Sequence, residues 1–167
     1  MTHSDTVQSK IFRNAAEFLP VFRQWKQAGD TVVFTNGCFD LVHRGHIDSL
    51  SKAADLGTRL VVGLNSDSSV KILKGENRPI IDQESRAILL AALLMVDAVV
   101  IFVEETPYEL ISAIVPDVLV KGSEYQVEEI AGFEVVLAAG GKVERINLTE
   151  GFSTSDLIQK IKETIET

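Results

Sequence analysis

The sequence of 167 residues contains a single cysteine, Cys38, so it cannot form an internal disulfide. No apolar stretch reaches the roughly 18 uninterrupted residues that a membrane span requires, and no apolar run near the first residue resembles a signal peptide. We therefore expect a cytoplasmic protein without a membrane segment. A net charge of −8 argues against a general binder of nucleic acid, because nucleic-acid-binding surfaces are usually basic.

Two common nucleotide-binding patterns are missing as well. The chain has no GxGxxG sequence and no Walker A sequence, which disfavours a dinucleotide oxidoreductase and a P-loop ATPase. Zinc ligands are scarce, because Cys38 is the only thiol and no third histidine lies near His43 and His46. Cys38 itself is better explained as a small buried residue than as a nucleophile.

Basic residues are concentrated in the first half of the chain. Residues 1–86 contain 11 Lys/Arg against 10 Asp/Glu, whereas residues 87–167 contain 5 against 14. Four of the basic residues follow His46 within one stretch, which predicts a positive pocket for phosphates in an otherwise acidic protein. They are Lys71, Lys74, Arg78 and Arg86. For each of the four alone, a solvated helical face is the simpler explanation.

An apolar content of 46% in a chain of this length supports one domain with a single core. Segments typical of strands alternate with segments typical of helices, which predicts an α/β fold with a parallel sheet and right-handed crossovers. We expect five strands, at 31–34, 60–64, 98–103, 118–120 and 142–146. An N-terminal segment, residues 1–30, is predicted to form a helix over 11–26 that packs on the main domain, residues 31–167.

Several helix boundaries are predicted from capping residues and turn residues. The segment Asn65–Asp67 and the carboxylate of Asp82 are expected to cap the helices that follow them. Thr106, followed by proline, is expected to cap a helix over 106–115, and a further helix is expected over 130–139.

The most informative segment runs from Phe34 to His46 and reads FTNGCFDLVHRGH. It leaves an apolar strand and delivers His43 and His46 to the predicted start of a helix, where the first amides have no intrahelical acceptor and favour an anion. Gly45 lets a ligand approach the backbone, and the histidines add donors whose charge can rise when phosphate binds. A histidine near a helix start is often a cap or a surface residue, but the pair with glycine between predicts a phosphate site.

Other polar segments follow the neighbouring predicted strands. Asn65–Asp67 comes after the second strand, and Lys121–Tyr125 comes after the fourth. In an open parallel sheet, ligands bind beyond the carboxyl ends of the strands, so these segments are expected to meet residues 36–46 there.

Five segments together resemble the adenylyltransferase domain of bacterial ADP-heptose synthesis, within the nucleotidyltransferase superfamily that carries HxGH. They read TNGCFDLVHRGH, GLNSDSSVKILKGENRPI, ESRAILLAALLMVDAVVIFVEETPYELI, PDVLVKGSEY and GFSTSDLIQKI. The resemblance runs from about Thr31 to Ile161. It implies a Rossmann-like three-layer fold with a five-stranded sheet. It also implies transfer of AMP from ATP to D-glycero-β-D-manno-heptose 1-phosphate, with release of pyrophosphate, to give ADP-heptose for lipopolysaccharide core synthesis.

The resemblance implies roles for individual residues. Its catalytic residues, which would contact the nucleotide phosphates, are His43, His46, Lys74 and Arg86. Its nucleotide-binding residues are Thr35, Asn36, Gly37, Cys38, Phe39, Asp40, Gly45, Lys121, Gly122, Ser153 and Thr154. Its acceptor-binding residues are Asn65, Asp67, Arg78, Glu124 and Tyr125. Asp40 could equally cap a loop, and Ser153 with Asp156 also forms an ordinary capping box.

No residue is implied as a metal ligand, and Mg²⁺ is expected to bind through the nucleotide phosphates. The family is often fused to a sugar kinase, so we expect a functional partnership with a separate heptose kinase. An apolar segment at 88–96 leaves room for a homodimer.

Two alternatives remain open at this point. One is a CTP-dependent cytidylyltransferase acting on glycerol 3-phosphate or a related polyol phosphate, although Leu148 stands where that group usually has arginine. The other is a noncatalytic nucleotide-binding module, because α/β sheets host many functions. The heptose family often has aspartate at the position of Glu124, so the acceptor sugar is less firmly implied than the reaction.

Overall fold

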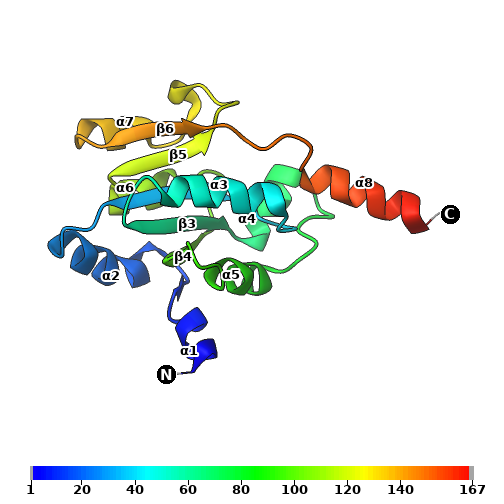
Figure 1. Ribbon diagram of the computed structural model, residues 1–167, viewed down its shortest axis with the longest axis horizontal. Helices are drawn as coiled ribbons and strands as arrows, with labels where there is room; N and C mark the ends of the chain where they lie inside the picture. Colours follow the sequence, from blue (N-terminus) through cyan, green and yellow to red (C-terminus); the bar gives the residue numbers. More distant parts are fainter. Residues whose placement is uncertain (1, 166–167) are drawn as a thin grey trace.

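The computed structural model describes residues 2–165 and shows a parallel sheet with helices on both faces (Figure 1). The sheet has six strands in the order β1-β4-β3-β2-β5-β6, and every neighbouring pair is parallel. The strands are β1 (Ile11–Phe12), β2 (Val32–Gly37), β3 (Arg59–Asn65), β4 (Ala98–Phe102), β5 (Val118–Gly122) and β6 (Lys142–Ile146). The α/β class and the parallel sheet are confirmed.

The sixth strand corrects the predicted number of five. β1 lies where the start of a helix was predicted, and it pairs with Val99 and Val100 of β4 at the sheet edge. The helix begins later because Asn14 caps it by accepting a hydrogen bond from the amide of Glu17 (3.0 Å). A strand of two residues is too short to show an alternating pattern in the sequence.

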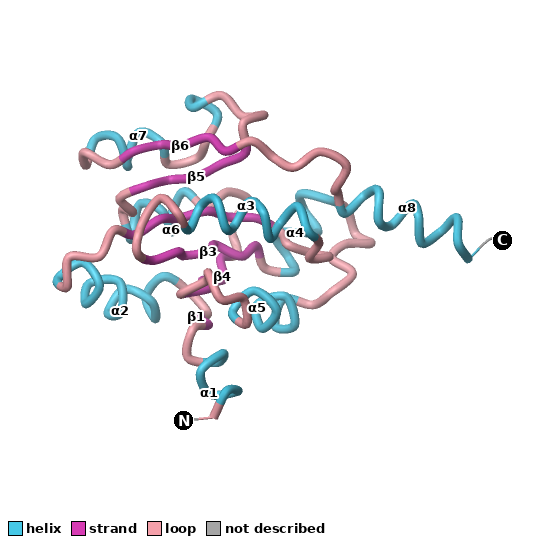
Figure 2. The backbone as a smooth tube through the Cα atoms, in the orientation of Figure 1, coloured by secondary structure: helices cyan, strands magenta, loops and turns pink. Residues whose placement is uncertain are grey.

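The helices form two layers. They are α1 (His3–Gln8), α2 (Ala15–Gln27), α3 (Arg44–Ala54), α4 (Asp67–Lys74), α5 (Gln83–Ala91), α6 (Tyr108–Ile114), α7 (Phe133–Ala138) and α8 (Thr154–Ile165), with a 3₁₀ turn at Val127–Glu129. One core cluster joins α3 and α5 to the sheet, and a second joins α2, α6 and α7 to its other face (Figure 2). The predicted three-layer arrangement is therefore present, and α2 of the N-terminal segment packs on the sheet.

The first residue of each of these helices is set by capping side chains and backbone conformation more than by the pattern of apolar residues. The predicted caps at Ser66 and Asp82 are formed, because their side chains accept the amides of Ser69 (3.2 Å) and Ser85 (2.9 Å). The predicted cap at Thr106 is not formed, because α6 begins at Tyr108 with Pro107 in the capping position. The helix expected over 130–139 begins only at Phe133, because Gly132 takes a left-handed conformation with φ 81°.

The parallel register brings the carboxyl ends of five strands to one edge. Gly37 lies beside Leu64, Asn65 beside Phe102, and Gly122 beside Ile146. The helix α8 extends beyond this edge and has no buried residue (Figure 1). Among residues 2–165, no helix is long and apolar enough to cross a lipid bilayer.

Replacing Leu119 with alanine tests the contribution of the second core cluster. Leu119 is fully buried in β5, so Leu119→Ala is expected to lower the free energy of unfolding by about 2–5 kcal/mol. Leu94 is 98% exposed, and Leu94→Ala should change stability by less than about 0.5 kcal/mol. Urea denaturation of the two variants measures the difference, and equal effects would contradict the assignment of this core.

Candidate functional site

A cavity of about 730 Å³ opens at the carboxyl edge of the sheet. Nearly all the residues that the sequence predicted for the site line it. They are Thr35, Asn36, Gly37, Cys38, Phe39, Asp40, His43, Gly45, His46, Asn65, Lys74, Arg78, Lys121, Gly122, Glu124, Tyr125, Ser153 and Thr154. The two exceptions are Arg86 and Asp67, which do not line the cavity. Beyond the strand ends, the cavity draws on the first turn of α3, the end of α4 and the starts of α6 and α8.

The two histidines lie together at the start of α3. His43 occupies the capping position, and its amide donates a hydrogen bond to Nδ1 of His46 (3.3 Å). The two rings are stacked with their centroids 3.9 Å apart, and the ring of Phe39 lies 5.1 Å from that of His46. Nδ1 of His43 is buried and has no hydrogen-bond partner among the described residues. This nitrogen is therefore available to a group that enters the cavity.

The environment of the histidine pair favours neutral rings. Burial, followed by repulsion from His43, lowers the pKa of His46 from 6.5 to about 4, and burial also lowers the pKa of His43. Because Nδ1 of His46 accepts a hydrogen bond, a neutral ring carries its proton on Nε2 and can donate from that atom. A bound phosphate would favour the charged form, since an anion raises the pKa of a nearby histidine.

Gly45 allows the side chain of Phe152 to approach the backbone of α3 closely, a contact that the sequence did not predict. A Cβ at this position would lie 3.0 Å from Cβ of Phe152 and 3.1 Å from the ring of His43. Phe152 also stacks near His43, with ring centroids 6.4 Å apart, and packs against the guanidinium of Arg44. The loop before α8 is therefore brought directly onto the first turn of α3.

Asp40 has a structural role in this arrangement. Its buried carboxylate accepts hydrogen bonds from Nε of Arg78 (2.6 Å) and from the amides of Ile80 (2.8 Å) and Ile81 (3.0 Å). Burial opposes its charge, but these donors outweigh burial and lower the pKa of Asp40. Of the two roles considered for Asp40, nucleotide binding and loop capping, the geometry favours loop capping. The carboxylate fixes the chain after α4 against the loop after β2.

Arg86 is fully buried and forms no part of the cavity surface. Its guanidinium donates to the carbonyl oxygens of Cys38 (2.5 Å), Asn65 (2.9 Å) and Ile81 (2.9 Å) and to the carboxylate of Asp67 (2.8 Å). The geometry therefore gives no support to direct contact with a nucleotide phosphate by Arg86, or with the acceptor by Asp67. Arg86 instead joins the loop after β2 to the end of β3 and to the segment before α5.

Lys121 and Glu124 lie at the end of β5. Nζ of Lys121 makes a long hydrogen bond to the carbonyl oxygen of Asn36 (3.4 Å) and lies 5.5 Å from the ring centroid of Tyr125. Burial lowers the pKa of Lys121. A side chain at Gly122 would overlap the carboxylate of Glu124, so glycine makes room for that carboxylate.

At the start of α8, Ser153 forms a helix cap and also borders the cavity, whereas phosphate binding by Ser153 stays a prediction. Its hydroxyl accepts the amide of Asp156 (3.0 Å), as an ordinary cap does, and Ser153 and Thr154 also line the cavity. No group of three or more His, Cys, Asp or Glu within residues 2–165 is placed to hold a metal ion. Binding of Mg²⁺ through nucleotide phosphates therefore stays a prediction.

The cavity is also lined by residues that were not predicted from the sequence. They are Ser49, Leu50, Leu73, Glu105, Thr106, Pro107, Glu129, Ile130, Ala131, Ile146, Leu148, Thr149, Phe152 and Ser155. The segment 105–107 follows the carboxyl end of β4, so the rule that placed the other loops at this edge also applies to it. Phe152 had no comparable signal, because a single aromatic residue in a loop forms no pattern.

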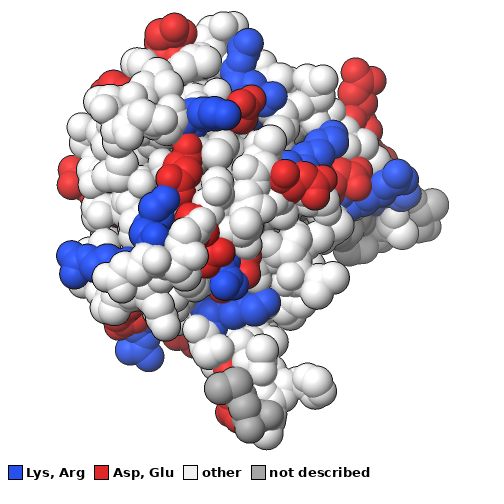
Figure 3. All heavy atoms as spheres, turned by 60° about the vertical axis from the view of Figure 1, so that its left-hand side comes forward, with Lys and Arg blue, Asp and Glu red and all other residues white. Residues whose placement is uncertain are grey.

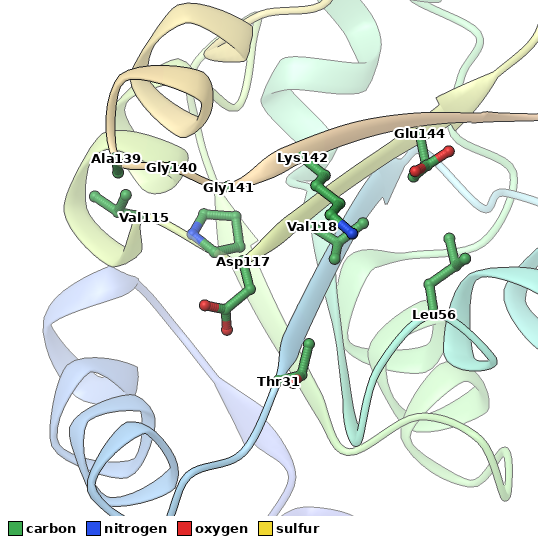
Figure 4. Close-up of a pocket in the computed structure, with 11 residues that line it drawn as sticks. Thr31, Leu56, Val115, Asp117, Val118, Ala139, Gly140, Gly141, Lys142 and Glu144 are labelled. Carbon is green, nitrogen blue, oxygen red and sulfur yellow. The ribbon is translucent and has the colours of Figure 1, made fainter.

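A second cavity, of about 310 Å³, opens at the opposite, amino end of the strands (Figure 4). Two carboxylates line it, on Asp117 and Glu144. That of Asp117 accepts hydrogen bonds from the amide of Val32 (2.8 Å) and from Nζ of Lys26 (2.5 Å). On the face that includes this end, acidic and basic side chains are interspersed (Figure 3). The smaller cavity shows no cluster of groups suited to phosphate, so the carboxyl edge is the candidate site.

The model of the family described as Cytidylyltransferase-like matches residues 34–160. This segment contains the histidine pair and the cavity-lining loops after β2 and β5. The chain belongs to the cytidylyltransferase-like family. The family expected from the sequence motifs is thereby confirmed.

Relatives of this cytidylyltransferase-like chain include two proteins named bifunctional protein HldE. That of Syntrophotalea carbinolica is 51% identical over 98% of this chain, and that of Mesorhizobium japonicum is 46% identical over 96%. The chain spans about a third of the length of these relatives, 33% and 32% respectively.

Two solved structures are similar to this chain in fold. A lipopolysaccharide core biosynthesis protein from Thermoplasma volcanium has a TM-score of 0.59 and 28% identity, covering 72% of this chain and 98% of its own. A pantoate-beta-alanine ligase from Francisella tularensis has a TM-score of 0.58 and 16% identity, covering 94% of this chain and 79% of its own. The second likeness concerns the fold alone.

Removing the guanidinium of Arg86 tests its structural role. Arg86→Met leaves three carbonyl groups and the carboxylate of Asp67 without their donor, so the free energy of unfolding should fall by about 3–5 kcal/mol. Arg23 is exposed, and Arg23→Met should change stability by less than about 0.5 kcal/mol. Guanidinium denaturation compares the two variants. A stable Arg86→Met protein that has lost nucleotide binding would show that the guanidinium serves a ligand.

The low pKa of His46 predicts a pH dependence of stability. Between pH 6.5 and about 4, the unfolded chain takes up a proton that folded His46 does not accept, so stability should fall as the pH is lowered through this range. His46→Gln should lose less stability over the range, and His3→Gln should behave as the unmodified chain. Urea denaturation at pH 6.5 and pH 4.5 measures this, and identical losses in all three proteins would contradict the neutral, buried ring.

Proposed function

We propose that this chain transfers AMP from ATP to a sugar 1-phosphate, D-glycero-β-D-manno-heptose 1-phosphate, and gives ADP-heptose and pyrophosphate. The observation that carries the proposal is the identity of about half, over nearly the whole chain, with bifunctional HldE proteins. The matched third contains the cytidylyltransferase-like segment, which favours nucleotidyl transfer among the activities of a bifunctional protein. The motif resemblance to the heptose family supports the same acceptor.

The reaction requires no nucleophile from the protein. An oxygen of the sugar phosphate forms a bond to the α-phosphorus of ATP, and the bond from that phosphorus to the bridging oxygen of the β-phosphate breaks. The electron pair leaves with pyrophosphate, and an anionic acceptor phosphate has no proton to lose. The protein therefore contributes positioning and charge neutralisation.

The residues around α3 are suited to the nucleotide phosphates. The start of this helix offers backbone amides without intrahelical partners, and His43 and His46 add ring nitrogens. Lys74 adds a positive charge from the end of α4, and Ser153 and Thr154 add hydroxyls from the start of α8. These groups together fit a triphosphate whose α-phosphorus lies near the histidine pair.

Mg²⁺ fits this proposal as an ion that enters with the nucleotide. Magnesium commonly keeps water and phosphate oxygens as ligands, with few from the protein. It would neutralise charge on the triphosphate, while the histidines and Lys74 hold the phosphate oxygens. A cytoplasmic location, a homodimer and cooperation with a separate heptose kinase stay predictions.

The nucleotide is the main point to test. A pyrophosphate-release assay with Mg-ATP or Mg-CTP, each against heptose 1-phosphate and glycerol 3-phosphate, separates the adenylyl reaction from the cytidylyl alternative. We expect pyrophosphate with ATP and heptose 1-phosphate. Release with CTP and glycerol 3-phosphate alone would reverse the proposal, and nucleotide binding without release from any acceptor would favour a noncatalytic module.

Substitution of His46 tests the site within this reaction. His46→Ala removes a preorganised donor near the α-phosphate, so turnover should fall about 10²- to 10³-fold. His3 lies in α1, outside the cavity, and His3→Ala should keep the turnover of the unmodified chain. Steady-state measurement of pyrophosphate release compares the variants. Unchanged turnover in His46→Ala would remove this residue from the mechanism.

A further inference from the structure

The titratable and charged side chains that line the cavity form two main groups. The first lies around the start of α3 and the end of α4, and the second lies at the end of β5 and in the segment that follows it. The first group contains His43, His46, Lys74 and Arg78, with Asp40 paired to Arg78. The second group contains Lys121, Glu124 and Glu129. Glu105 also lines the cavity, but it follows β4, which β3 and β2 separate from β5.

The sheet itself supports this division. Leu119 packs in the core cluster beneath α6 and α7, and Lys121 follows it by two residues on the same strand. Because side chains alternate along a strand, Lys121 belongs to the α6 face of the sheet. Ile130, another lining residue, is buried in the same cluster. The histidines belong to α3, which packs on the other face.

The balance of charge differs between the two groups. Around α3, cations and neutral histidines outnumber the one carboxylate, which already has a partner in Arg78. Around the end of β5, the lining carries one ammonium and two carboxylates. Glu124 interacts electrostatically with Lys121, and Glu129 accepts the amide of Gln126. A triphosphate carries several negative charges and would be repelled there. A ligand with a single phosphate and several hydroxyl groups fits better, because carboxylates act only as hydrogen-bond acceptors.

We propose that Lys121 binds the phosphate of the acceptor, a sugar 1-phosphate, and that the carboxylates around it accept hydrogen bonds from the sugar hydroxyls. This inference rests on the proposed function and divides the cavity between its two substrates. It moves Lys121 from the nucleotide, where the sequence resemblance placed it, to the acceptor.

The contacts of Lys121 leave its ammonium group available for such a ligand. Its only hydrogen bond among residues 2–165 is the long one to Asn36 (3.4 Å), although an ammonium has three donors. Burial disfavours its charge, so a bound phosphate would stabilise it. Asn36 lies at the end of β2, directly before the loop that leads to the histidines. An acceptor phosphate at Lys121 would therefore sit beside the nucleotide phosphates.

Substitution of two lysines separates the two groups. Lys121→Met should raise KM for heptose 1-phosphate about 10- to 100-fold and change KM for ATP by less than about threefold. Lys74→Met should instead raise KM for ATP and change KM for heptose 1-phosphate by less than about threefold. Lys142 lines the cavity at the amino end of the strands (Figure 4), and Lys142→Met should change neither constant. Thermal unfolding of each variant confirms that it is folded.

The outcome for Lys121 can be read separately from the outcome for the proposed function. If the unmodified chain releases pyrophosphate and Lys121→Met raises KM for ATP as much as KM for the acceptor, the inference fails and the function stands. If no acceptor gives pyrophosphate, the function fails, and calorimetric titration with heptose 1-phosphate decides the inference. Weaker binding by Lys121→Met than by Lys142→Met would support it, and equal or absent binding in both would overturn it.

Discussion

The guanidinium of Arg86 holds together three segments that are distant in the sequence. It donates hydrogen bonds to carbonyl oxygens in the loop after β2, at the end of β3 and before α5. A buried cation is costly unless it is fully paired, and here four donor contacts, one of them to the carboxylate of Asp67, compensate for desolvation. The loop after β2 leads to His43 and the segment before α5 carries the amides that fix Asp40, so the shape of the cavity depends on this one side chain.

The histidine pair shows how this rigid frame favours an anionic ligand. Two stacked rings in a partly buried position keep His46 neutral in the free protein, because charging both would add repulsion to the cost of desolvation. A phosphate oxygen beside the ring would offset both penalties. Under the proposed function, binding of nucleotide is coupled to uptake of a proton. Affinity should then rise as the pH falls through the pKa of the bound ring, and the gain should be complete below the pKa of the free ring.

Local patterns in the sequence predicted the parallel sheet, the helix start that carries the histidine pair, and the loops after β2, β3 and β5 that line the cavity. Strand ends, glycines and helix starts are specified by neighbouring residues. Arg86 could not be placed in the same way. Its acceptors are mostly backbone carbonyls, at Cys38, Asn65 and Ile81, and every residue type supplies such a group, so no pattern marks a buried arginine. The strand β1 was missed because two residues carry no periodicity, and Phe152 because its partners lie far away in the sequence.

The distribution of charge in the folded molecule differs from the distribution along the sequence. The basic residues of the first half of the sequence suggested one positive pocket. In the structure, however, the guanidinium of Arg86 donates to backbone carbonyls, and Arg78 forms an ion pair with Asp40. What remains positive around α3 is Lys74 and the helix start, together with histidines that become charged only beside an anion. On the other face of the sheet, Lys121 lines the cavity together with Glu124 and Glu129 from the acidic second half. Folding thus converts an uneven distribution along the sequence into two environments within one cavity, one suited to a polyphosphate and one to a phosphorylated polyol.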